Sequence, residues 1–244
     1  MSPRKTLATT HRVLRQLGHD RRTLALLFVV PPMLLTIIKY AFQSEPSKFN
    51  QLGPMLLGIF PMVMMYLVAS IATLRERTNG TLERLMTMPA GKLDFILGYA
   101  AAFSLVALVQ ATISAVVILG LLRVTVMSGA LSVILGALAS AFLGTSLGLF
   151  TSAFATSEFQ AIQFMPTFIF PQLLVCGLFV ARDHMVRFLQ LLADVFPLTY
   201  SVDAMKQIAL YADWSTTLTR DFVIVLAYAL LALLLGSLTI RRRQ

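Results

Sequence analysis

Charge is the scarcest property of this sequence. Only 13% of its 244 residues are Asp, Glu, Lys or Arg and 57% are hydrophobic, whereas a soluble domain of this size carries about a quarter charged residues. Cysteine is scarce too: Cys176 is the single one. A disulfide within the chain and a cysteine-based metal site are therefore excluded. The composition indicates an integral membrane protein.

The groups that chemistry inside a membrane requires are also missing. The three histidines lie outside the long apolar runs, and no two carboxylates within those runs stand where they could face each other. A serine nucleophile elbow and a HExxH helix are absent. Gly91 and Lys92 look like a fragment of a phosphate loop, but Met86 and Leu93 stand where that loop requires glycine and serine or threonine. We therefore expect no catalytic, metal, cofactor or nucleotide site in this chain, and no enzyme activity of its own.

Six runs of the sequence are long and apolar enough to cross a membrane as helices. A spanning helix needs roughly 20 apolar residues to cover about 30 Å of hydrocarbon. Pro31, Pro32 and Lys39 interrupt the first run, which we interpret as a retained span and not as a cleaved signal peptide. The predicted fold is an all-α polytopic membrane protein with one domain, residues 1–244. The six predicted spans are residues 23–42, 52–74, 95–122, 129–154, 159–181 and 222–240.

The basic residues are distributed in a way that orients the chain. Thirteen of the 20 fall on one side of a six-span topology. By the positive-inside rule that side is cytoplasmic, so both termini and the segment between spans two and three are predicted to be cytoplasmic, in a multi-pass protein of the plasma (inner) membrane. A net charge of +9 with this distribution does not indicate nucleic-acid binding. The thirteen are Arg4, Lys5, Arg12, Arg15, Arg21, Arg22, Arg75, Arg77, Arg84, Lys92, Arg241, Arg242 and Arg243.

Two segments outside the spans carry apolar stripes at helical spacing. Val13, Leu14 and Leu17 share one face of residues 10–22, with arginines around it, which predicts an interfacial helix on the cytoplasmic leaflet. A solvated basic tail is the alternative. Residues 182–221 hold two apolar stripes separated by a proline, which predicts an outer hairpin of two short helices that re-enters the bilayer. A water-exposed outer cap is the alternative for this hairpin.

Small residues recur at every fourth position of the fourth predicted span. In lipid, such a stripe lets two helix backbones approach closely enough to gain dispersion contacts. We expect the stripe to pack within the bundle, and a subunit interface is the alternative. Its members are Ser128, Ser132, Gly136, Ser140, Gly144, Gly148 and Ser152.

A charged segment, residues 74–89, separates spans two and three. Asn79 can cap a helix that begins at Gly80, because its side chain can accept a hydrogen bond from a backbone amide one turn further on. Pro89 ends that helix at Met88, since a residue before proline disfavours helical geometry. The resulting short helix is amphipathic, and we expect it to lie across the cytoplasmic membrane surface. A charged connector that only separates the two spans is the alternative.

The same segment resembles the signature of a known family. Residues 74–89 read LRERTNGTLERLMTMP, followed by Lys92-Leu93-Asp94 and Gly98. They are similar to the pattern Glu-Arg-x-x-Gly-Thr-Leu-Glu-x-Leu…Pro that precedes the third span in ABC-2 type exporter permeases. Residues 170–179 (FPQLLVCGLF) and 196–204 (FPLTYSVDA) resemble the fifth span and outer helices of the drug-exporter branch, including daunorubicin-type permeases. Because the blocks occur in the right order, the resemblance covers essentially the whole chain.

The resemblance implies a permease subunit of an ATP-driven exporter. Such permeases work as two transmembrane subunits with two ATP-binding cassette subunits, so Mg-ATP is expected on the partner, and the second permease would make a homodimer or a heterodimer. Residues 80–88 would form the coupling helix that contacts the ATP-binding subunit. The turn around Glu158 is short and poor in charge, so a second contact there would be slight. The coupling residues that the resemblance implies are Arg75, Glu76, Arg77, Gly80, Thr81, Leu82, Glu83, Arg84 and Leu85.

The resemblance also implies a substrate path along spans one, two and five, between the two permeases. Aromatic and methionine side chains there would suit a lipophilic or amphipathic substrate, drug-like or lipid-like, although a stripe of such residues is more often bundle core. A secondary transporter and a non-transporting membrane anchor or assembly subunit are the alternatives. The first is disfavoured because no carboxylate or histidine lies within a predicted span. The path residues predicted are Phe60, Met64, Phe164, Phe168 and Phe170.

Overall fold

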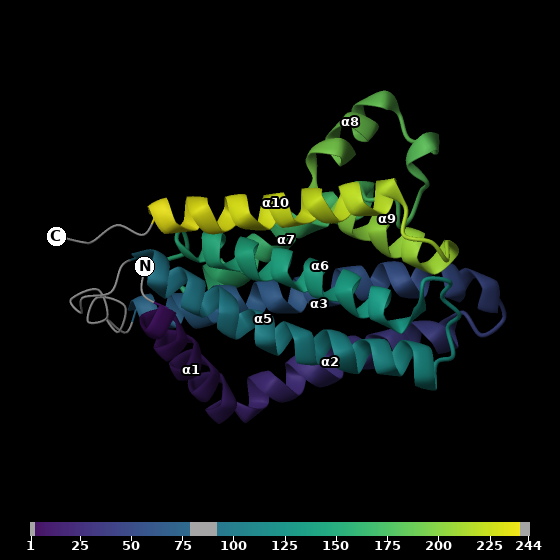
Figure 1. The fold of residues 1–244 in the computed structure, drawn as a ribbon. Helices are drawn as coiled ribbons and strands as arrows, with labels where there is room; N and C mark the ends of the chain where they lie inside the picture. Colours follow the sequence, from purple (N-terminus) through teal and green to yellow (C-terminus); the bar gives the residue numbers. More distant parts are fainter. Residues whose placement is uncertain (1–2, 79–91, 240–244) are drawn as a thin grey trace.

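The computed structural model describes residues 3–78 and 92–239, and this part of the chain is helical with no strand. The all-α class predicted from the sequence is confirmed. The predicted coupling helix, residues 80–88, lies outside the described residues. The helices are α1 (Pro3–His19), α2 (Arg21–Ala41), α3 (Pro46–Thr78), α5 (Lys92–Val116), extended by a π-helical turn (Val117–Leu121), α6 (Gly129–Ser152), α7 (Glu158–Val175), a 3-10 turn (Arg182–His184), α8 (Arg187–Val195), α9 (Pro197–Leu210) and α10 (Thr216–Thr239). Figure 1 shows the long helices side by side, with α8 standing away from one end of the bundle.

Five helical segments are long and apolar enough to cross a membrane: α2, α3, residues 96–121, α6 and α10. The fifth predicted span, residues 159–181, is not among them. Its helix, α7, has 18 residues, contains two prolines and ends at Val175. Gly177, two residues later, has a φ of +91°, a left-handed conformation that does not continue a helix. The helical part of this run is therefore shorter than its apolar length, and a six-span topology stays a prediction.

The central helix of the bundle is α3, which packs against α2, α5, α6, α7 and α9. It contains Pro54 and Pro61, both buried, and the helix is continuous through both. It is also longer than the predicted span 52–74, because it continues through three charged residues to Thr78. The charged segment therefore begins as part of the spanning helix and not as a separate element.

The stripe of small residues on α6 packs within the bundle, as predicted. A β-carbon added at Gly144 would lie 2.0 Å from the carbonyl oxygen of Met62, and one added at Gly148 would lie 2.4 Å from that of Tyr66. Only glycine permits this approach of α6 to the backbone of α3, which forms the largest helix contact in the described residues. At Gly136 the same stripe faces α9 instead.

One residue, Asp20, separates α1 from α2. Its carboxylate caps α2, because it accepts hydrogen bonds from the backbone N–H of Thr23 (3.1 Å) and from the Thr23 hydroxyl (2.7 Å). α1 turns back onto the beginning of α5, where Gly98 leaves room for it: a β-carbon there would lie 2.6 Å from the β-carbon of Thr9. The Thr10 hydroxyl donates to the Gly98 carbonyl oxygen at 3.1 Å. Whether α1 lies on a membrane surface stays a prediction.

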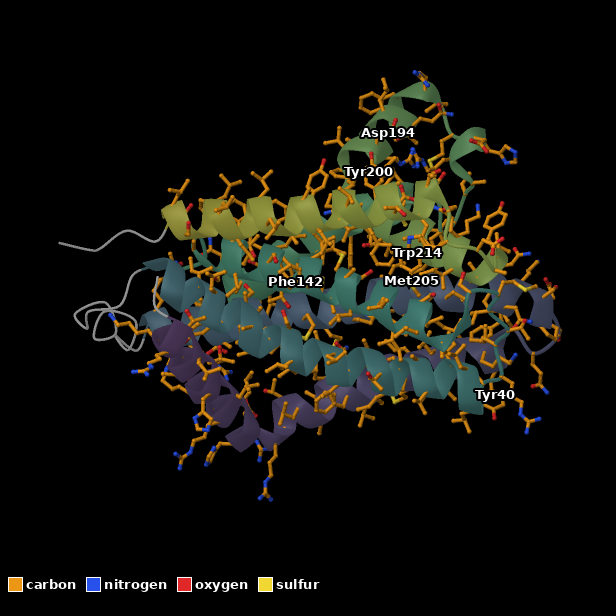
Figure 2. The ribbon with its side chains drawn as sticks, viewed as in Figure 1. Tyr40, Phe142, Asp194, Tyr200, Met205 and Trp214 are labelled. Atoms are coloured by element: carbon orange, nitrogen blue, oxygen red, sulfur yellow. The ribbon has the colours of Figure 1, made fainter. Side chains whose placement is uncertain are left out.

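The opposite end of the bundle carries α8 and α9, the two helices found in the range predicted for the outer hairpin. Arg182 donates from its guanidinium to the carboxylates of Asp194 and Asp203 (2.8 Å for Asp203), which ties α8 to α9. The Tyr200 hydroxyl donates to the Asp194 carbonyl oxygen at 2.8 Å, and Figure 2 shows these two residues close together where the helices meet. The Tyr228 hydroxyl of α10 donates to the Val195 carbonyl oxygen. The helix pair is thus fixed to the bundle by side-chain contacts.

Candidate functional site

Arg75, Glu76 and Arg77 occupy consecutive positions near the end of α3. Successive residues of an α-helix point about 100° apart, so these three side chains leave the helix in different directions. Each of them meets a different part of the chain. We call this group of contacts the α3 junction; besides the three α3 residues it comprises Arg12, Asp20, Tyr99, Ala153, Ala155 and Glu158.

Glu76 is the buried member of the α3 junction, with its side chain only 4% exposed. Arg12 of α1 donates from Nη1 to Oε1 of Glu76 (2.8 Å) and from Nη2 to Oε2 (3.0 Å). This is the two-pronged geometry in which a guanidinium binds a carboxylate most strongly. Nη2 also donates to the Tyr99 hydroxyl of α5 at 2.7 Å, and the guanidinium lies 5.7 Å from the centre of the Tyr99 ring. Three helices, α1, α3 and α5, therefore meet at one ion pair, with α5 joined to it through Arg12.

Arg77 reaches the end of α6. Its guanidinium donates to the carbonyl oxygens of Ala153 (2.7 Å) and Ala155, which follow the last residue of that helix. The carbonyl groups at a helix C-terminus lack partners within the helix and carry partial negative charge, so a cation stabilises them. Arg77 therefore holds the α6–α7 turn against α3.

Arg75 reaches the beginning of α7. It donates from Nε and Nη2 to the two carboxylate oxygens of Glu158 at 2.8 and 3.0 Å, and its Nη1 lies 3.7 Å from the Asp20 carboxylate at the α1–α2 break. The hydrogen bonds from Arg75, with its positive charge as a smaller contribution, lower the pKa of Glu158. Both side chains are about half exposed (49% each), so solvent screens this pair far more than it screens the pair of Glu76.

The lowered pKa of Glu158 gives a prediction about acid stability. A carboxylate whose pKa is lowered in the folded protein contributes stability above its ordinary pKa, about 4.3, and loses it as the pH falls through the lowered value. We expect Glu158→Gln to lower the free energy of unfolding by less than about 1 kcal/mol at pH 7, because the pair is exposed. At a pH below the lowered pKa the variant and the parent should be equally stable. Thermal unfolding in detergent at both pH values measures this, and an equal difference at both would contradict it.

The structure brings together only part of the predicted coupling site. Arg75, Glu76 and Arg77 lie in the α3 junction, whereas residues 80–85 lie outside the described part of the chain. Glu76 does not present its carboxylate to the surface, because Arg12 covers it. Arg12 was expected on the basic face of an interfacial helix, and it is instead held by Glu76.

The five predicted path residues lie on two helices that pack against each other, α3 and α7. Phe60, Met64 and Phe164 are half-buried, and Phe168 and Phe170 are exposed. The rings of Phe164 and Phe168 meet edge to face, with centroids 6.3 Å apart. The aromatic side chains at 168 and 170 therefore face away from the core of this chain.

Sequence reasoning missed the partners of the α3 junction. Arg12, Tyr99 and Glu158 were not assigned to it, although a glutamate next to the end of a span needs a cation to be tolerated there. That requirement was the available signal, but it does not say which of several arginines supplies the charge. Among the described residues, no three side chains of His, Cys, Asp and Glu gather closely enough to hold a metal ion.

Comparison with known proteins gives a consistent family relation. The model of the ABC-2 type transporter family matches residues 4–211. ABC transporter G family member 20 of Dictyostelium discoideum is 24% identical over 176 residues, which cover 72% of this chain and 24% of that protein. The probable multidrug ABC transporter permease YbhR of Escherichia coli is 29% identical over 161 residues, 64% of this chain and 43% of the relative. The inner membrane transport permease YhhJ of Escherichia coli is 29% identical over 179 residues, 73% and 47%. This chain spans less than half the length of these curated relatives.

Proposed function

This chain belongs to the ABC-2 type transporter family, and from that premise we propose that it is the permease subunit of an ATP-driven exporter for a lipophilic or amphipathic substrate. Membership makes it a multi-pass membrane component of an ABC transporter, which its apolar helices support. A separate ATP-binding cassette subunit, expected in two copies, would bind Mg-ATP. Two relatives are named permeases, one of them for multidrug transport and the other for the inner membrane. A drug-like or lipid-like substrate fits the apolar composition of the spans.

The proposed topology has six spans, with α7 as the fifth and α10 as the sixth. α7 packs against α3 and α9, and its outward face is apolar, with Phe168, Phe170 and Leu174 exposed. Burying such a face in lipid or against a second subunit is favourable by about 25 cal/mol per Å². Both termini would be cytoplasmic, α1 would lie at the cytoplasmic surface, and α8 and α9 would form the outer hairpin.

The observation that best supports the coupling proposal is the pair of Arg12 and Glu76. Residues 80–88 follow α3 directly in the sequence, and the proposed coupling helix lies there. Motion of that helix, driven by the ATP-binding subunits, would act on the end of α3. Because Glu76 is bonded to α1 and to α5 through Arg12, and Arg75 and Arg77 to the α6–α7 turn, the α3 junction would pass the displacement to several helices at once.

A second permease subunit would pack against α2 and α7, which both contact α3. α2 has few buried residues for its length, and Leu26, Val29 and Ile37 on it are exposed. Exposed apolar helix faces on a membrane protein are covered either by lipid or by another subunit. The substrate path, with Phe60, Met64, Phe164, Phe168 and Phe170 as its proposed lining, would run between the two copies. The dimer type, homomeric or heteromeric, follows from which permease is purified with this chain.

The proposed coupling is tested by charge reversal at Glu83. The permease is purified with an ATP-binding subunit, for which a neighbouring gene is the first candidate, and ATPase activity is measured in lipid with and without the permease. We expect the permease to stimulate ATP hydrolysis and Glu83→Arg to weaken assembly of the two subunits about tenfold, because the substitution reverses the charge of a side chain proposed to lie at their interface. Glu45→Arg is the matched control, since Glu45 precedes α3 and forms an exposed pair with Lys48, at the end of α3 opposite the coupling segment.

Two outcomes would contradict the proposal. If Glu83→Arg assembles and stimulates ATP hydrolysis as the parent does, the coupling helix is not at residues 80–88. If transport in vesicles proceeds without any ATP-binding subunit, the chain is a secondary transporter. An ATP-binding subunit that assembles with this chain but shows no substrate-dependent activity would favour an anchor or assembly subunit instead.

A further inference from the structure

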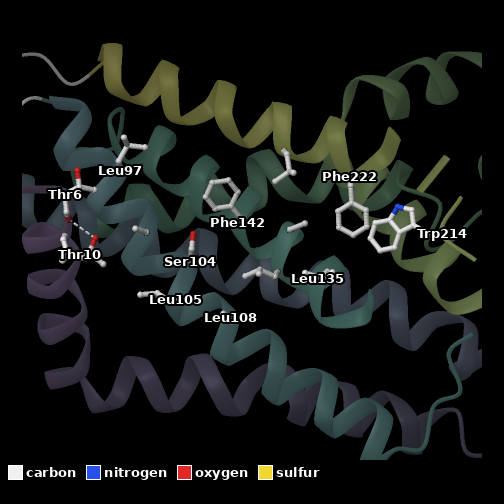
Figure 3. A pocket seen from close by; sticks show the side chains of 15 residues that line it. Thr6, Thr10, Leu97, Ser104, Leu105, Leu108, Leu135, Phe142, Trp214 and Phe222 are labelled. Carbon is white, nitrogen blue, oxygen red and sulfur yellow. Dashed lines mark hydrogen bonds between the residues drawn. The ribbon is translucent and has the colours of Figure 1, made fainter. Parts of the chain in front are cut away.

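A groove runs along the face of the bundle formed by α5, α6 and α10. It encloses about 1040 Å³, at the upper end of the roughly 300–1,000 Å³ of ordinary ligand pockets. α6 packs against both α5 and α10, whereas these two have little contact with each other. α6 therefore forms the floor of the groove, with Leu135 and Phe142 on it, and α5 and α10 form its walls (Figure 3). This face is separate from α2 and α7, where the second subunit and the substrate path are proposed.

The polar atoms in the groove are already bonded to the protein. The Thr10 hydroxyl lies within hydrogen-bond distance of the carbonyl oxygens of Thr6 (2.9 Å) and Gly98 (3.1 Å). The Ser104 hydroxyl donates to the Ala100 carbonyl oxygen at 2.7 Å, and the Trp214 indole N–H donates to the Thr219 hydroxyl at 2.9 Å. Thr6 also lines the groove and likewise has a partner, and the rest of the lining is hydrocarbon and aromatic. A polar ligand would therefore leave its own groups unpaired in this groove, whereas hydrocarbon would not.

The α5 wall of the groove is about as long as the hydrocarbon of one leaflet, and the groove continues past that wall to the α9–α10 connection. Along α5 its lining extends from Leu97 to Leu108, about 16 Å at about 1.5 Å per residue. The hydrocarbon of one leaflet is about 15 Å thick, half of the roughly 30 Å core. One end of the groove is closed by α1, and the other by Trp214, whose ring stacks on Phe222 with centroids 5.4 Å apart. α5, α6 and α10 are all candidate spans, so the groove is directed along the membrane normal.

The end closed by α1 is positively charged. α1 contains no acidic residue and four residues that are Lys or Arg. Arg4 is exposed and stands one turn before Leu7, which lines the groove. The first turn of a helix adds unpaired N–H groups and partial positive charge, and both favour an anion. An occupant with hydrocarbon in the groove would thus have its polar end next to cations.

We infer that this groove binds an anionic phospholipid from the leaflet on the α1 side of the membrane, with its acyl chains between α5 and α10 and its phosphate beside Arg4. The inference rests on the membrane insertion of the chain and not on the cargo or the ATP-binding subunit. The lipid would fill the space between two walls that do not meet, and its headgroup would hold α1 at the membrane surface. It is distinct from the exported substrate, because it lies on another face of the bundle.

The single tryptophan of the chain, Trp214, reports on occupancy, because it lies at the far end of the groove. The full chain is reconstituted in phosphatidylcholine vesicles that contain a small fraction of either phosphatidylglycerol or phosphatidylcholine brominated near the methyl ends of the acyl chains. Bromine quenches tryptophan fluorescence at short range. We expect the brominated phosphatidylglycerol to quench about fivefold more effectively than the brominated phosphatidylcholine, the preference that one cation near an anionic lipid provides.

Three variants separate the groove from ordinary lipid around the protein. Arg4→Gln should bring the ratio of the two quenching constants close to one. The double substitution Ala101→Phe and Ala139→Phe fills the groove and should abolish the headgroup preference. Ala227→Phe places the same ring on an exposed position of α10 outside the groove and should keep the parent ratio. Circular dichroism checks that each variant is folded. If the double variant does not fold, the result for Arg4→Gln decides, because Arg4 is exposed and its substitution should not disturb folding.

Other outcomes would overturn the inference. Equal quenching by the two lipids in the parent protein would mean that the groove holds only unselected bilayer lipid. An unchanged headgroup preference in the groove-filled variant would place the anionic lipid elsewhere. Loss of a dimer in that variant, measured by light scattering, would assign the groove to a second copy of the chain.

Discussion

Glu76→Ala is expected to lower the free energy of unfolding by about 3 kcal/mol, the lower part of the range for breaking a buried ion pair. The carboxylate is 4% exposed and accepts two hydrogen bonds from Arg12. Its removal leaves the guanidinium half-buried with only the Tyr99 hydroxyl as a partner among these groups. The lower part of the range applies because the Arg12 side chain is 32% exposed and water solvates part of its charge. Thermal unfolding in detergent, followed by circular dichroism, should show a decrease in Tm of about 10 °C.

The matched control is Glu45→Ala, which removes a glutamate just before α3 from its ion pair with Lys48. Glu45 and Lys48 are both more than half exposed, so the expected change is below about 1 kcal/mol. Equal losses of unfolding free energy for Glu76→Ala and Glu45→Ala would contradict the explanation that burial makes the loss of Glu76 more costly. The double variant Arg12→Met and Glu76→Met should recover most of the lost stability, because no buried charge is then left unpaired. If it recovers stability but not stimulation of the ATP-binding subunit, the pair acts in coupling and not only in folding.

Gly144→Ala is expected to lower the free energy of unfolding by more than about 3 kcal/mol, above the usual cost of overpacking a core. The added β-carbon would lie 2.0 Å from the Met62 carbonyl oxygen, about half the distance of an ordinary contact. The obstacle is backbone and not a flexible side chain, so it is relieved only if α3 and α6 separate. The yield of monodisperse protein and its Tm in detergent measure the effect.

Gly120→Ala is the control for the loss of a glycine in a helical segment. It lies in the π-helical turn, with no other heavy atom within 4 Å of the new β-carbon, and alanine favours helix by up to about 1 kcal/mol over glycine. We expect Gly120→Ala to be neutral or stabilising. A Gly144→Ala protein with the parent Tm would show that α3 and α6 are farther apart than described.

The sequence predicted the features that depend on composition along the chain. Hydropathy alone located α2, α3, α6 and α10, because an apolar run of spanning length has few other uses. The small residues of α6 were predicted to pack within the bundle because such a stripe allows close approach of two helices. This reason holds whichever helix lies against the stripe. The fifth run was less predictable: its hydropathy extends to residue 181, but the left-handed Gly177 ends the regular structure earlier, and hydropathy does not register backbone conformation.

The α3 junction was predictable only in part. Arg75, Glu76 and Arg77 were recognised because they follow an apolar run, and their place in a family signature gave them a role. Their partners lie 55 to 83 positions away in the sequence, and nothing local marks Arg12 as different from the other arginines of α1. The apolar pattern stops at Leu74, yet the helix goes on to Thr78, because contacts with distant side chains stabilise charges that hydropathy treats as a boundary.

The backbone contact of α6 with α3 at Gly144 and Gly148 limits how the bundle can deform. Two helices that touch through main-chain atoms leave no side-chain layer to slide or repack, so they have one relative position and not several. α3 and α6 then move as one rigid pair, so any displacement of α3 carries α6 with it. α2 and α7 contact this rigid pair less extensively than α3 and α6 contact each other, so in the proposed transport cycle rotation and tilting would fall to α2 and α7. If the proposed cycle is correct, we expect an engineered disulfide between α3 and α6 to leave transport intact and one between α3 and α7 to stop it.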